Sequence, residues 1–210
     1  MSDAPKNVLI TGCSSGIGHE TALHLHKEGW TVYATARRPE SISDLAEAGC
    51  KTLALDVTDE ASMQAAVAAV EEAEGSVGAL VNNAGYSQSG ATESVAMDSV
   101  RRQFETNVFG LIRMCQLVLP SMRRAGAGRI VNISSMGGRV TFPGGGIYHA
   151  TKHAVEAISD ALRFEVRGFG VHVICIEPGL ITTEFGNAAV GSIALATVSG
   201  PPPSFPSALS

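Results

Sequence analysis

The sequence predicts a doubly wound α/β fold, in which helices cover both faces of one parallel β-sheet. Short runs rich in β-branched residues alternate along the chain with longer stretches whose apolar residues recur at helical spacing. The short runs are apolar almost throughout, which is typical of parallel strands buried on both faces. Strict alternation of strand and helix then requires crossover connections, which are right-handed and build a doubly wound sheet.

The first half of the chain predicts three strands, each followed by a helix. The strands are the apolar runs at 7–11, 30–35 and 52–55. The helices follow at 16–28, 41–48 and 60–72, the last of them rich in alanine.

The second half predicts three more strands and two long helices. The strands are expected at 79–82, 129–133 and 171–176, with helices at 98–123 and 148–166 between them. In doubly wound sheets ligands bind beyond the carboxyl ends of the strands. We therefore expect the functional motifs directly after the strands.

We expect a dinucleotide-binding catalytic domain over 1–185 and an irregular tail over 186–210. The 210 residues, of which 45% are hydrophobic and 17% charged, suffice for one domain with a substantial core. After Phe185 the sequence is rich in small residues, Pro and Ser and has no periodic pattern.

Composition argues against several other classes of protein. The formal net charge of −5 offers no basic surface for nucleic acid. No apolar run reaches the roughly 18 residues of a membrane span, and no signal peptide is evident at the N-terminus. The 4 cysteines stand far apart and form no CxxC pair, so we expect neither a metal site nor disulfides, and a cytoplasmic location.

A glycine-rich turn lies between the first strand and its helix. Gly12, Gly16 and Gly18 are spaced as GxxxGxG within 11–18. Such a turn lets a pyrophosphate approach the backbone N–H groups at the start of the helix. The spacing differs from the general GxGxxG fingerprint, and an ordinary strand–helix turn is the alternative. We expect a dinucleotide to contact Gly12, Ser14, Ser15, Gly16, Ile17 and Gly18.

Two arginines follow the second strand and favour NADP over NAD. Ala36 stands where an NAD-selective site usually places an acid for the ribose hydroxyls, and Arg37 and Arg38 come next. A guanidinium binds a 2′-phosphate through charge-assisted hydrogen bonds. The alternative is a pair of solvated arginines.

Tyr148 and Lys152 are the candidate acid–base pair. They are four residues apart in a helical pattern and therefore share one face. An ammonium near a phenol favours the phenolate, so we expect Lys152 to lower the pKa of Tyr148. Tyr148 then becomes a general acid for a carbonyl oxygen or a general base for an alcohol.

With these motifs the chain resembles the short-chain dehydrogenase/reductase family over roughly residues 7–183. The resemblance rests on TGxxxGxG at 11–18, Asp56 after the third strand, and Asn82-Asn83-Ala84-Gly85 after the fourth. It also rests on Asn107, Ser135, Tyr148 and Lys152, and on Pro178-Gly179-Leu180-Ile181-Thr182-Thr183 after the sixth strand. The resemblance implies a Rossmann fold and hydride transfer between NADP(H) and a carbonyl compound or secondary alcohol.

The resemblance also implies roles for single residues. Tyr148 would exchange the proton and Ser135 would hydrogen-bond the substrate oxygen. Lys152 would bind the nicotinamide ribose, and Asn107 would hold a water that links Lys152 to solvent. Ser14 beside Arg37 resembles the 2′-phosphate pair of NADP-preferring, hydroxysteroid-dehydrogenase-like members.

The remaining cofactor contacts implied by the resemblance come from loops after four strands. They are Asp56 and Val57 at the adenine, Asn83, Ala84 and Gly85 at the adenosine side, and Pro178, Ile181 and Thr183 at the carboxamide. Asp56 could instead be a solvated turn acid, Asn107 a residue that caps or bends its helix, and Ser135 an ordinary strand-end serine. His149 and His153 are spaced as metal ligands are, but with no third ligand visible we read them as packing or surface residues.

The sequence departs from the family after Thr183. The helices that close over the substrate, the final helix and the seventh strand are not evident there. A catalytically impaired nucleotide-binding or oligomerising relative is therefore the alternative function. The small and apolar segment at 141–146 favours a hydrophobic carbonyl substrate, and the resemblance implies a homodimer built on the helices at 98–123 and 148–166.

Overall fold

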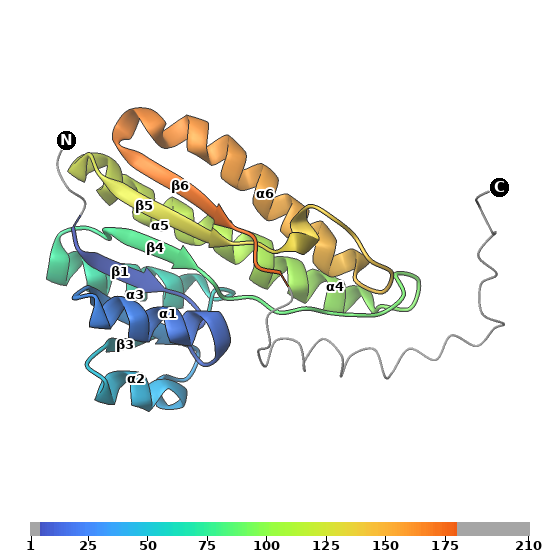
Figure 1. The fold of residues 1–210 in the computed structure, drawn as a ribbon, viewed down its shortest axis with the longest axis horizontal. Helices are drawn as coiled ribbons and strands as arrows, with labels where there is room; N and C mark the ends of the chain where they lie inside the picture. The colour runs from blue at the N-terminus through green and yellow to red at the C-terminus, as the bar shows by residue number, and fades with distance from the viewer. Residues whose placement is uncertain (1–4, 180–210) are drawn as a thin grey trace.

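A six-stranded parallel sheet forms the centre of the protein, with strand order β3-β2-β1-β4-β5-β6 (Figure 1). The computed structural model describes residues 5–179, and the statements below refer to these residues. The strands are β1 (Asn7–Ile10), β2 (Thr31–Ala36), β3 (Lys51–Ala54), β4 (Ala79–Asn82), β5 (Gly128–Ile133) and β6 (Val171–Ile176). The predicted doubly wound fold is confirmed. The predicted tail over 186–210 lies outside the described residues.

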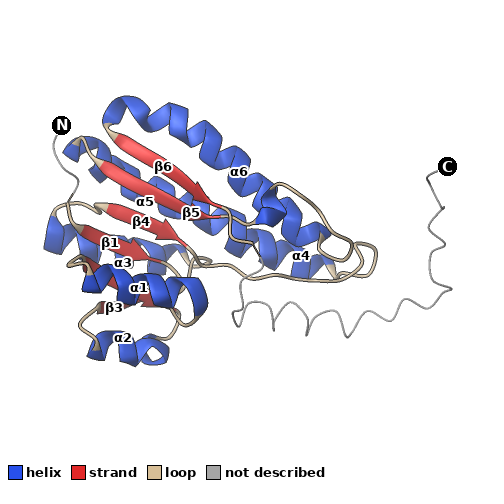
Figure 2. Ribbon diagram, in the orientation of Figure 1, coloured by secondary structure: helices blue, strands red, loops and turns tan. Residues whose placement is uncertain are grey.

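Helices connect the strands on the two faces of the sheet (Figure 2). They are α1 (Gly16–Lys27), α2 (Ser43–Glu47), α3 (Glu60–Glu74), α4 (Met97–Phe104), α5 (Gly110–Ala125) and α6 (Gly146–Val166). Short 3₁₀ turns occur at η1 (Pro39–Ile42), η3 (Met136–Gly138) and η4 (Arg167–Phe169), and a π-helical turn at η2 (Glu105–Phe109). No helix among residues 5–179 is long and apolar enough to cross a membrane.

Two hydrophobic clusters pack on opposite faces of the sheet. The larger cluster joins the sheet to α3, α5 and α6, with Leu9, Leu80 and Ile130 fully buried against them. The smaller cluster joins the sheet to α1 and α2 through Val8, Ile10 and their neighbours. Consecutive residues of β1 thus face different clusters, which explains why this strand is apolar throughout.

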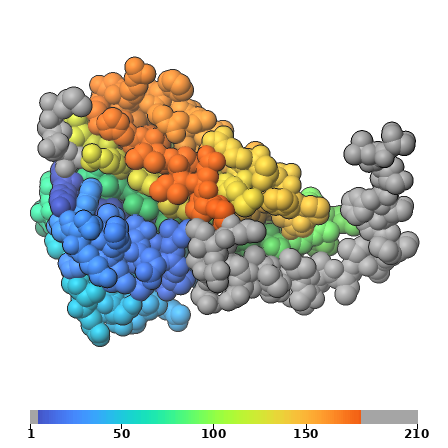
Figure 3. Space-filling model, in the orientation of Figure 1, coloured from blue at the N-terminus to red at the C-terminus, as the bar shows by residue number. Residues whose placement is uncertain are grey.

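β6 differs from the central strands because only one of its faces is covered by the described helices. Val171 and Val173 are buried, whereas Ile174 and Ile176 are 41% and 44% exposed. Figure 3 shows the deep-orange atoms of this end of the described chain on the visible surface. The expectation of a strand buried on both faces therefore does not hold for β6.

Helix boundaries depart from the predictions at two places. The predicted helix at 98–123 is α4, the π-helical turn η2 and α5 in succession, and α6 begins two residues before Tyr148. A π-helical turn inserts one extra residue into the helix and redirects a side chain. Here it contains Asn107, whose amide reaches sideways to the backbone of Tyr86.

Candidate active site

One large cavity, of about 1060 Å³, lies at the carboxyl ends of the strands. It extends from the glycine turn after β1, past the ends of β2, β3 and β4, to the first turn of α6. All the predicted site residues within 5–179 line it except Gly18 and Asn107. Ile181 and Thr183 lie outside the described residues. The structure thus brings the predicted cofactor and catalytic groups into one space.

The glycine turn brings the chain after β1 into contact with the chain after β4. Gly12 has a φ of +73°, and a Cβ atom built on it would lie 2.8 Å from the Cα atom of Ala84. Gly16 also has a positive φ, of 60°, where α1 begins. Only glycine is accommodated at position 12 without displacing Ala84. The N-terminus of α1 carries no acidic residue in its first turn, so its N–H groups and partial positive charge are available to an anion at the cavity.

Thr11 and Asn83 hold this junction together. The Thr11 hydroxyl oxygen accepts hydrogen bonds of 3.0 Å from the backbone N–H groups of both Asn83 and Ala84. The Asn83 amide donates in return to the backbone oxygens of Thr11 and Gly12, at 2.9 and 2.8 Å. Asn83 therefore shapes the turn with its side chain. Thr11 begins the TGxxxGxG motif, but the motif alone does not reveal this role. A buried threonine at a strand end is a usual hydrogen-bonding partner for neighbouring loops.

Gly18 does not line the cavity. A Cβ atom there would overlap the Asn83 amide and the backbone oxygen of Gly12. Gly18 therefore allows α1 to pack closely on the turn.

The end of β2 presents a cation to the cavity. Arg37 and Ser14 both line it and are both exposed, and Arg37 forms no ion pair within residues 5–179. Ala36 precedes Arg37 and is buried at 4% exposure. A guanidinium without an acidic partner at a ligand cavity is free to bind a phosphate.

Asp56 follows β3 and lines the cavity, but one of its carboxylate oxygens is hydrogen-bonded within its own turn. Its Oδ1 accepts hydrogen bonds from the backbone N–H and the hydroxyl of Thr58, at 2.9 and 2.7 Å. This arrangement stabilises the turn into α3. Val57 lines the cavity beside it.

Ser135, Tyr148 and Lys152 meet at the other end of the cavity. The Ser135 hydroxyl accepts a hydrogen bond of 3.0 Å from the N–H of Gly137 and hydrogen-bonds the Tyr148 phenol. The Lys152 Nζ donates to the backbone oxygen of Ile133 at 2.7 Å and lies 5.8 Å from the centre of the Tyr148 ring. The strand β5 and the helix α6 therefore fix these three side chains together.

The predicted effect of Lys152 on Tyr148 is wrong for the chain as described. Burial raises the pKa of Tyr148 above its ordinary 10.0, and the Ser135 hydrogen bond opposes this shift. Burial lowers the pKa of Lys152 from 10.5 to about 8. The reason is that the ammonium is directed to the Ile133 carbonyl, and both groups lose water on burial.

Asn107 lies below the cavity without lining it. Its Nδ2 donates to the oxygens of Tyr86 and Thr151 at 2.9 and 3.1 Å, and its Oδ1 accepts from the Tyr86 N–H at 3.1 Å. Thr151 lies between Tyr148 and Lys152 on α6, and its hydroxyl donates to the backbone oxygen of Tyr148 at 2.7 Å. Asn107 thus connects the π-helical turn with the first turns of α6 and the loop after β4.

The wall near Tyr148 is mainly aromatic and apolar. Phe142, Met136 and Tyr86 line the cavity, together with polar residues such as Gln88. Within the segment 141–146, Phe142 is the residue that reaches this wall. His149 packs edge-on against Phe142, with ring centres 5.8 Å apart, and its Nδ1 lies 3.1 Å from the oxygen of Gly137. Residues 5–179 contain no cluster of three potential metal ligands.

Comparison with known proteins gives the family of the chain. The family model described as short chain dehydrogenase matches residues 6–191. The chain belongs to the short chain dehydrogenase family. A 3-ketodihydrosphingosine reductase from Bacteroides thetaiotaomicron is 42% identical over 182 residues, which cover 86% of this chain and 66% of the relative. An NADPH-dependent 1-acyldihydroxyacetone phosphate reductase from Schizosaccharomyces pombe is 39% identical over 198 residues, covering 93% and 67%. The chain thus spans about two thirds of the length of these relatives.

Solved structures share the fold, including that of a short-chain dehydrogenase. One from Streptomyces avermitilis has a TM-score of 0.82 at 43% identity, covering 85% of this chain and 67% of that one. A 3-ketoacyl-(acyl-carrier-protein) reductase from Brucella melitensis, complexed with NADH, has a TM-score of 0.85 at 29% identity, covering 91% and 82%. ElxO with NADP bound has a TM-score of 0.81 at 32% identity, covering 90% and 79%.

Proposed function

We propose that the chain is an NADP(H)-dependent oxidoreductase that reduces a carbonyl group, or oxidises a secondary alcohol, with Tyr148 as the proton donor or acceptor. The observation that carries the proposal is the single cavity that joins the glycine turn and Arg37 to Ser135, Tyr148 and Lys152. A dinucleotide fits this cavity because Gly12 leaves room beside Ala84 and the start of α1 offers N–H groups to a pyrophosphate. When bound, NADP(H) supplies or accepts the hydride.

The residues at the α6 end supply positioning and the proton. Ser135 and Tyr148, already hydrogen-bonded to each other, together hold a substrate oxygen. In reduction, the Tyr148 phenol donates its proton to that oxygen as negative charge develops there. Because burial keeps the pKa of Tyr148 above its ordinary value, the phenol is protonated at neutral pH and is ready to act as an acid. In the reverse direction the same atom accepts the alcohol proton.

The preference for NADP over NAD rests on the end of β2. Arg37 and Ser14 line the cavity and offer a cation and a hydroxyl, and Ala36 brings no carboxylate. We assign them to the 2′-phosphate, as in NADP-preferring, hydroxysteroid-dehydrogenase-like members of the family. The NADPH-dependent relative agrees with this assignment, whereas the NADH complex of a structural neighbour shows that the fold alone does not decide it.

The proposed site residues keep the roles expected from the sequence, with two revisions. Lys152 binds the nicotinamide ribose, while Asp56, Val57, Asn83, Ala84, Gly85 and Pro178 surround the rest of the cofactor. Asn107 is proposed to position α6 and the loop after β4 through Thr151 and Tyr86. Gly18 is proposed to act through packing.

A homodimer is proposed on the face formed by α4, α5 and α6. Two phenylalanines, Phe164 on α6 and Phe109 in the π-helical turn η2 between α4 and α5, are 76% and 52% exposed in the described chain. Exposed aromatic side chains on neighbouring helices are a usual feature of a twofold interface.

The test is to mix the chain with NADPH and a series of aliphatic and aromatic ketones and to follow the nicotinamide absorbance. The apolar wall at Phe142 and Met136 predicts turnover that improves with the apolar size of the ketone. A chain that binds NADPH and reduces no ketone, and oxidises none of the matching alcohols, would favour the impaired nucleotide-binding relative over this proposal.

A further inference from the structure

A buried acid, Glu156, lies one helical turn beyond Lys152 on α6. It is 4% exposed, does not line the cavity and takes part in no step of the proposed reaction. Burying a carboxylate is costly unless a cation or hydrogen-bond donors compensate it. Its position therefore needs an explanation.

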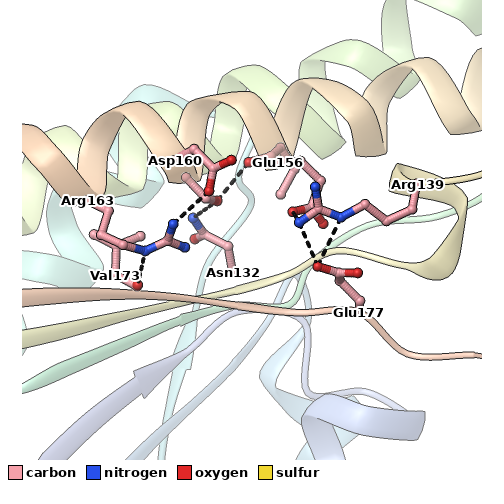
Figure 4. Close-up of polar contacts among 9 residues, drawn as sticks. Asn132, Arg139, Glu156, Asp160, Arg163, Val173 and Glu177 are labelled. Atoms are coloured by element: carbon pink, nitrogen blue, oxygen red, sulfur yellow. Dashed lines mark hydrogen bonds and ion pairs between the residues drawn. The ribbon is translucent and has the colours of Figure 1, made fainter.

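Arg139 supplies the compensating cation. The Arg139 Nη2 lies 2.9 Å from the Glu156 Oε2, and the same guanidinium binds Glu177 Oε1 through Nε and Nη2 at 3.1 and 2.8 Å. Figure 4 shows Arg139 reaching from the segment after η3 to a point between the two carboxylates. The Glu156 side chain is 6% exposed and that of Arg139 53%, so the ion pair joins a buried anion to a cation at the surface. An ion pair at this distance offsets part of the cost of burying the Glu156 carboxylate.

A neutral thiol also lies against Glu156. The Cys175 thiol of β6 lies against Glu156 and against the hydroxyls of Ser134 and Ser159. Arg139 contacts Glu156 Oε2 as an ion pair, and neither Glu156 oxygen accepts a well-aligned hydrogen bond from residues 5–179. Glu156 and Lys152 are four residues apart on α6 and both are buried, so little water separates the carboxylate from the ammonium.

Lys152 lacks a direct anionic partner. It is 7% exposed, its Nζ donates to the neutral Ile133 carbonyl, and it forms no ion pair with any described residue. Burial lowers its pKa to about 8, while charge on Cys175 and on Glu156 raises it. Burial raises the pKa of the Cys175 thiol to about 11, so Cys175 is uncharged near neutral pH. The Tyr148 phenol is also protonated there.

We propose that Glu156 is a positioning residue whose negative charge, paired with Arg139, keeps the Lys152 ammonium protonated in the active site. The charged and titratable groups around the pair are Tyr148 on α6, Cys175 on β6, and Arg139, Glu177 and Asp160 around the Glu156 carboxylate. Of these, Glu156 is the anion that acts on Lys152. The inference rests on the proposed function, because a protonated Lys152 matters for binding the nicotinamide ribose.

The test is the titration of Lys152 in the full-length chain, by NMR of lysines carrying ¹³C at Cε. The chain contains four lysines, Lys6, Lys27, Lys51 and Lys152, so the spectrum is simple, and Lys152→Met assigns the signal. In Glu156→Gln the midpoint of Lys152 should fall by roughly one pH unit, since one charge about a turn away is removed. Glu156→Leu, which also removes the charge, should shift it in the same direction.

Glu177→Gln is the matched control, because it removes a carboxylate that also binds Arg139 but does not act on Lys152. Its Lys152 midpoint should equal that of the wild-type chain. Both Glu156 variants should fold, because Arg139 keeps Glu177 as a partner and the buried Lys152 can lose its proton when the anion is removed. An unchanged Lys152 midpoint in both variants would overturn the proposal, and so would loss of native circular dichroism in both, since Glu156 would then be structural.

A second readout separates this inference from the proposed function. The NADPH affinity of the wild-type chain should weaken as pH rises through the Lys152 midpoint, and Glu156→Gln should move that decline to lower pH. If Lys152 titrates as proposed but NADPH affinity does not follow it, the electrostatic inference stands and the role of Lys152 at the ribose fails. If the midpoint does not move, the inference fails whatever the affinity does.

Discussion

Thr11→Val probes the junction on which the glycine turn depends. Valine keeps the shape of threonine and removes the oxygen that accepts hydrogen bonds from the N–H groups of Asn83 and Ala84, each at 3.0 Å. Thr11 is 1% exposed, so water cannot take the place of the hydroxyl on its own side. An unsatisfied buried donor costs about 1–3 kcal/mol. Asn83 and Ala84 line the cavity, so some water can reach their N–H groups. We therefore expect the loss of the two hydrogen bonds to lower the free energy of unfolding by about 2–4 kcal/mol.

The assay is equilibrium urea unfolding followed by the fluorescence of Trp30, the single tryptophan of the chain. Thr11→Ser is the matched control. It keeps the acceptor and loses one methyl group, which should cost about 1 kcal/mol. NADPH affinity should fall at least tenfold in Thr11→Val and little in Thr11→Ser, since the turn and the loop after β4 are no longer held together. A free energy of unfolding for Thr11→Val equal to that of Thr11→Ser would refute the reasoning.

Three further predictions concern the cofactor, assembly and alkaline stability. Arg37→Asp should erase or reverse the preference for NADPH over NADH, because losing a charge-assisted phosphate contact costs about 1.5–3 kcal/mol, or tenfold to over a hundredfold in affinity ratio; an unchanged ratio would contradict the assignment. Phe164→Glu should convert the dimer to a monomer in light scattering, and a wild-type chain that is already monomeric would contradict the proposed interface. Burial raises the pKa of the Cys13 and Cys115 thiols from 9.0 to about 12, so both stay protonated in the folded chain while they ionise in the unfolded chain. The free energy of unfolding should therefore fall between about pH 9 and pH 12. The lowered pKa of Lys152 opposes this fall by a smaller amount, because the folded chain loses that proton before the unfolded chain does. Cys115→Ala should make the fall shallower.

The alternation of strands and helices and the gathering of the site could be predicted from sequence because both follow from local patterns. Runs such as Val8-Leu9-Ile10 are apolar on consecutive residues, which only a strand covered on both faces requires, and motifs after parallel strands must meet at one edge of the sheet. The spacing of Tyr148 and Lys152 places both on one side of α6 in the same way. These inferences need no knowledge of packing.

The remaining features depend on tertiary contacts that no local pattern contains. The π-helical turn at Asn107 forms within a sequence of ordinary helical character, where the amide finds the backbone of Tyr86. The raised pKa of Tyr148 reflects how much water the assembled cavity removes, which outweighs the hydrogen bond from Ser135. In the sequence, Glu156 looks like an ordinary solvated acid on a helix. Its burial is explained only by the ion pair with Arg139, which approaches from the segment after η3.

The central claim is that Tyr148 exchanges the proton, and single-turnover hydride transfer in Tyr148→Phe tests it most directly. Tyr86→Phe is the control, because Tyr86 is another phenol that lines the cavity. The rate of NADPH oxidation by a ketone should fall by about 10²–10⁴ in Tyr148→Phe, the usual contribution of a positioned acid, while NADPH affinity changes little and Tyr86→Phe keeps most of the rate. A near wild-type rate in Tyr148→Phe would place the proton donor elsewhere and contradict the mechanism.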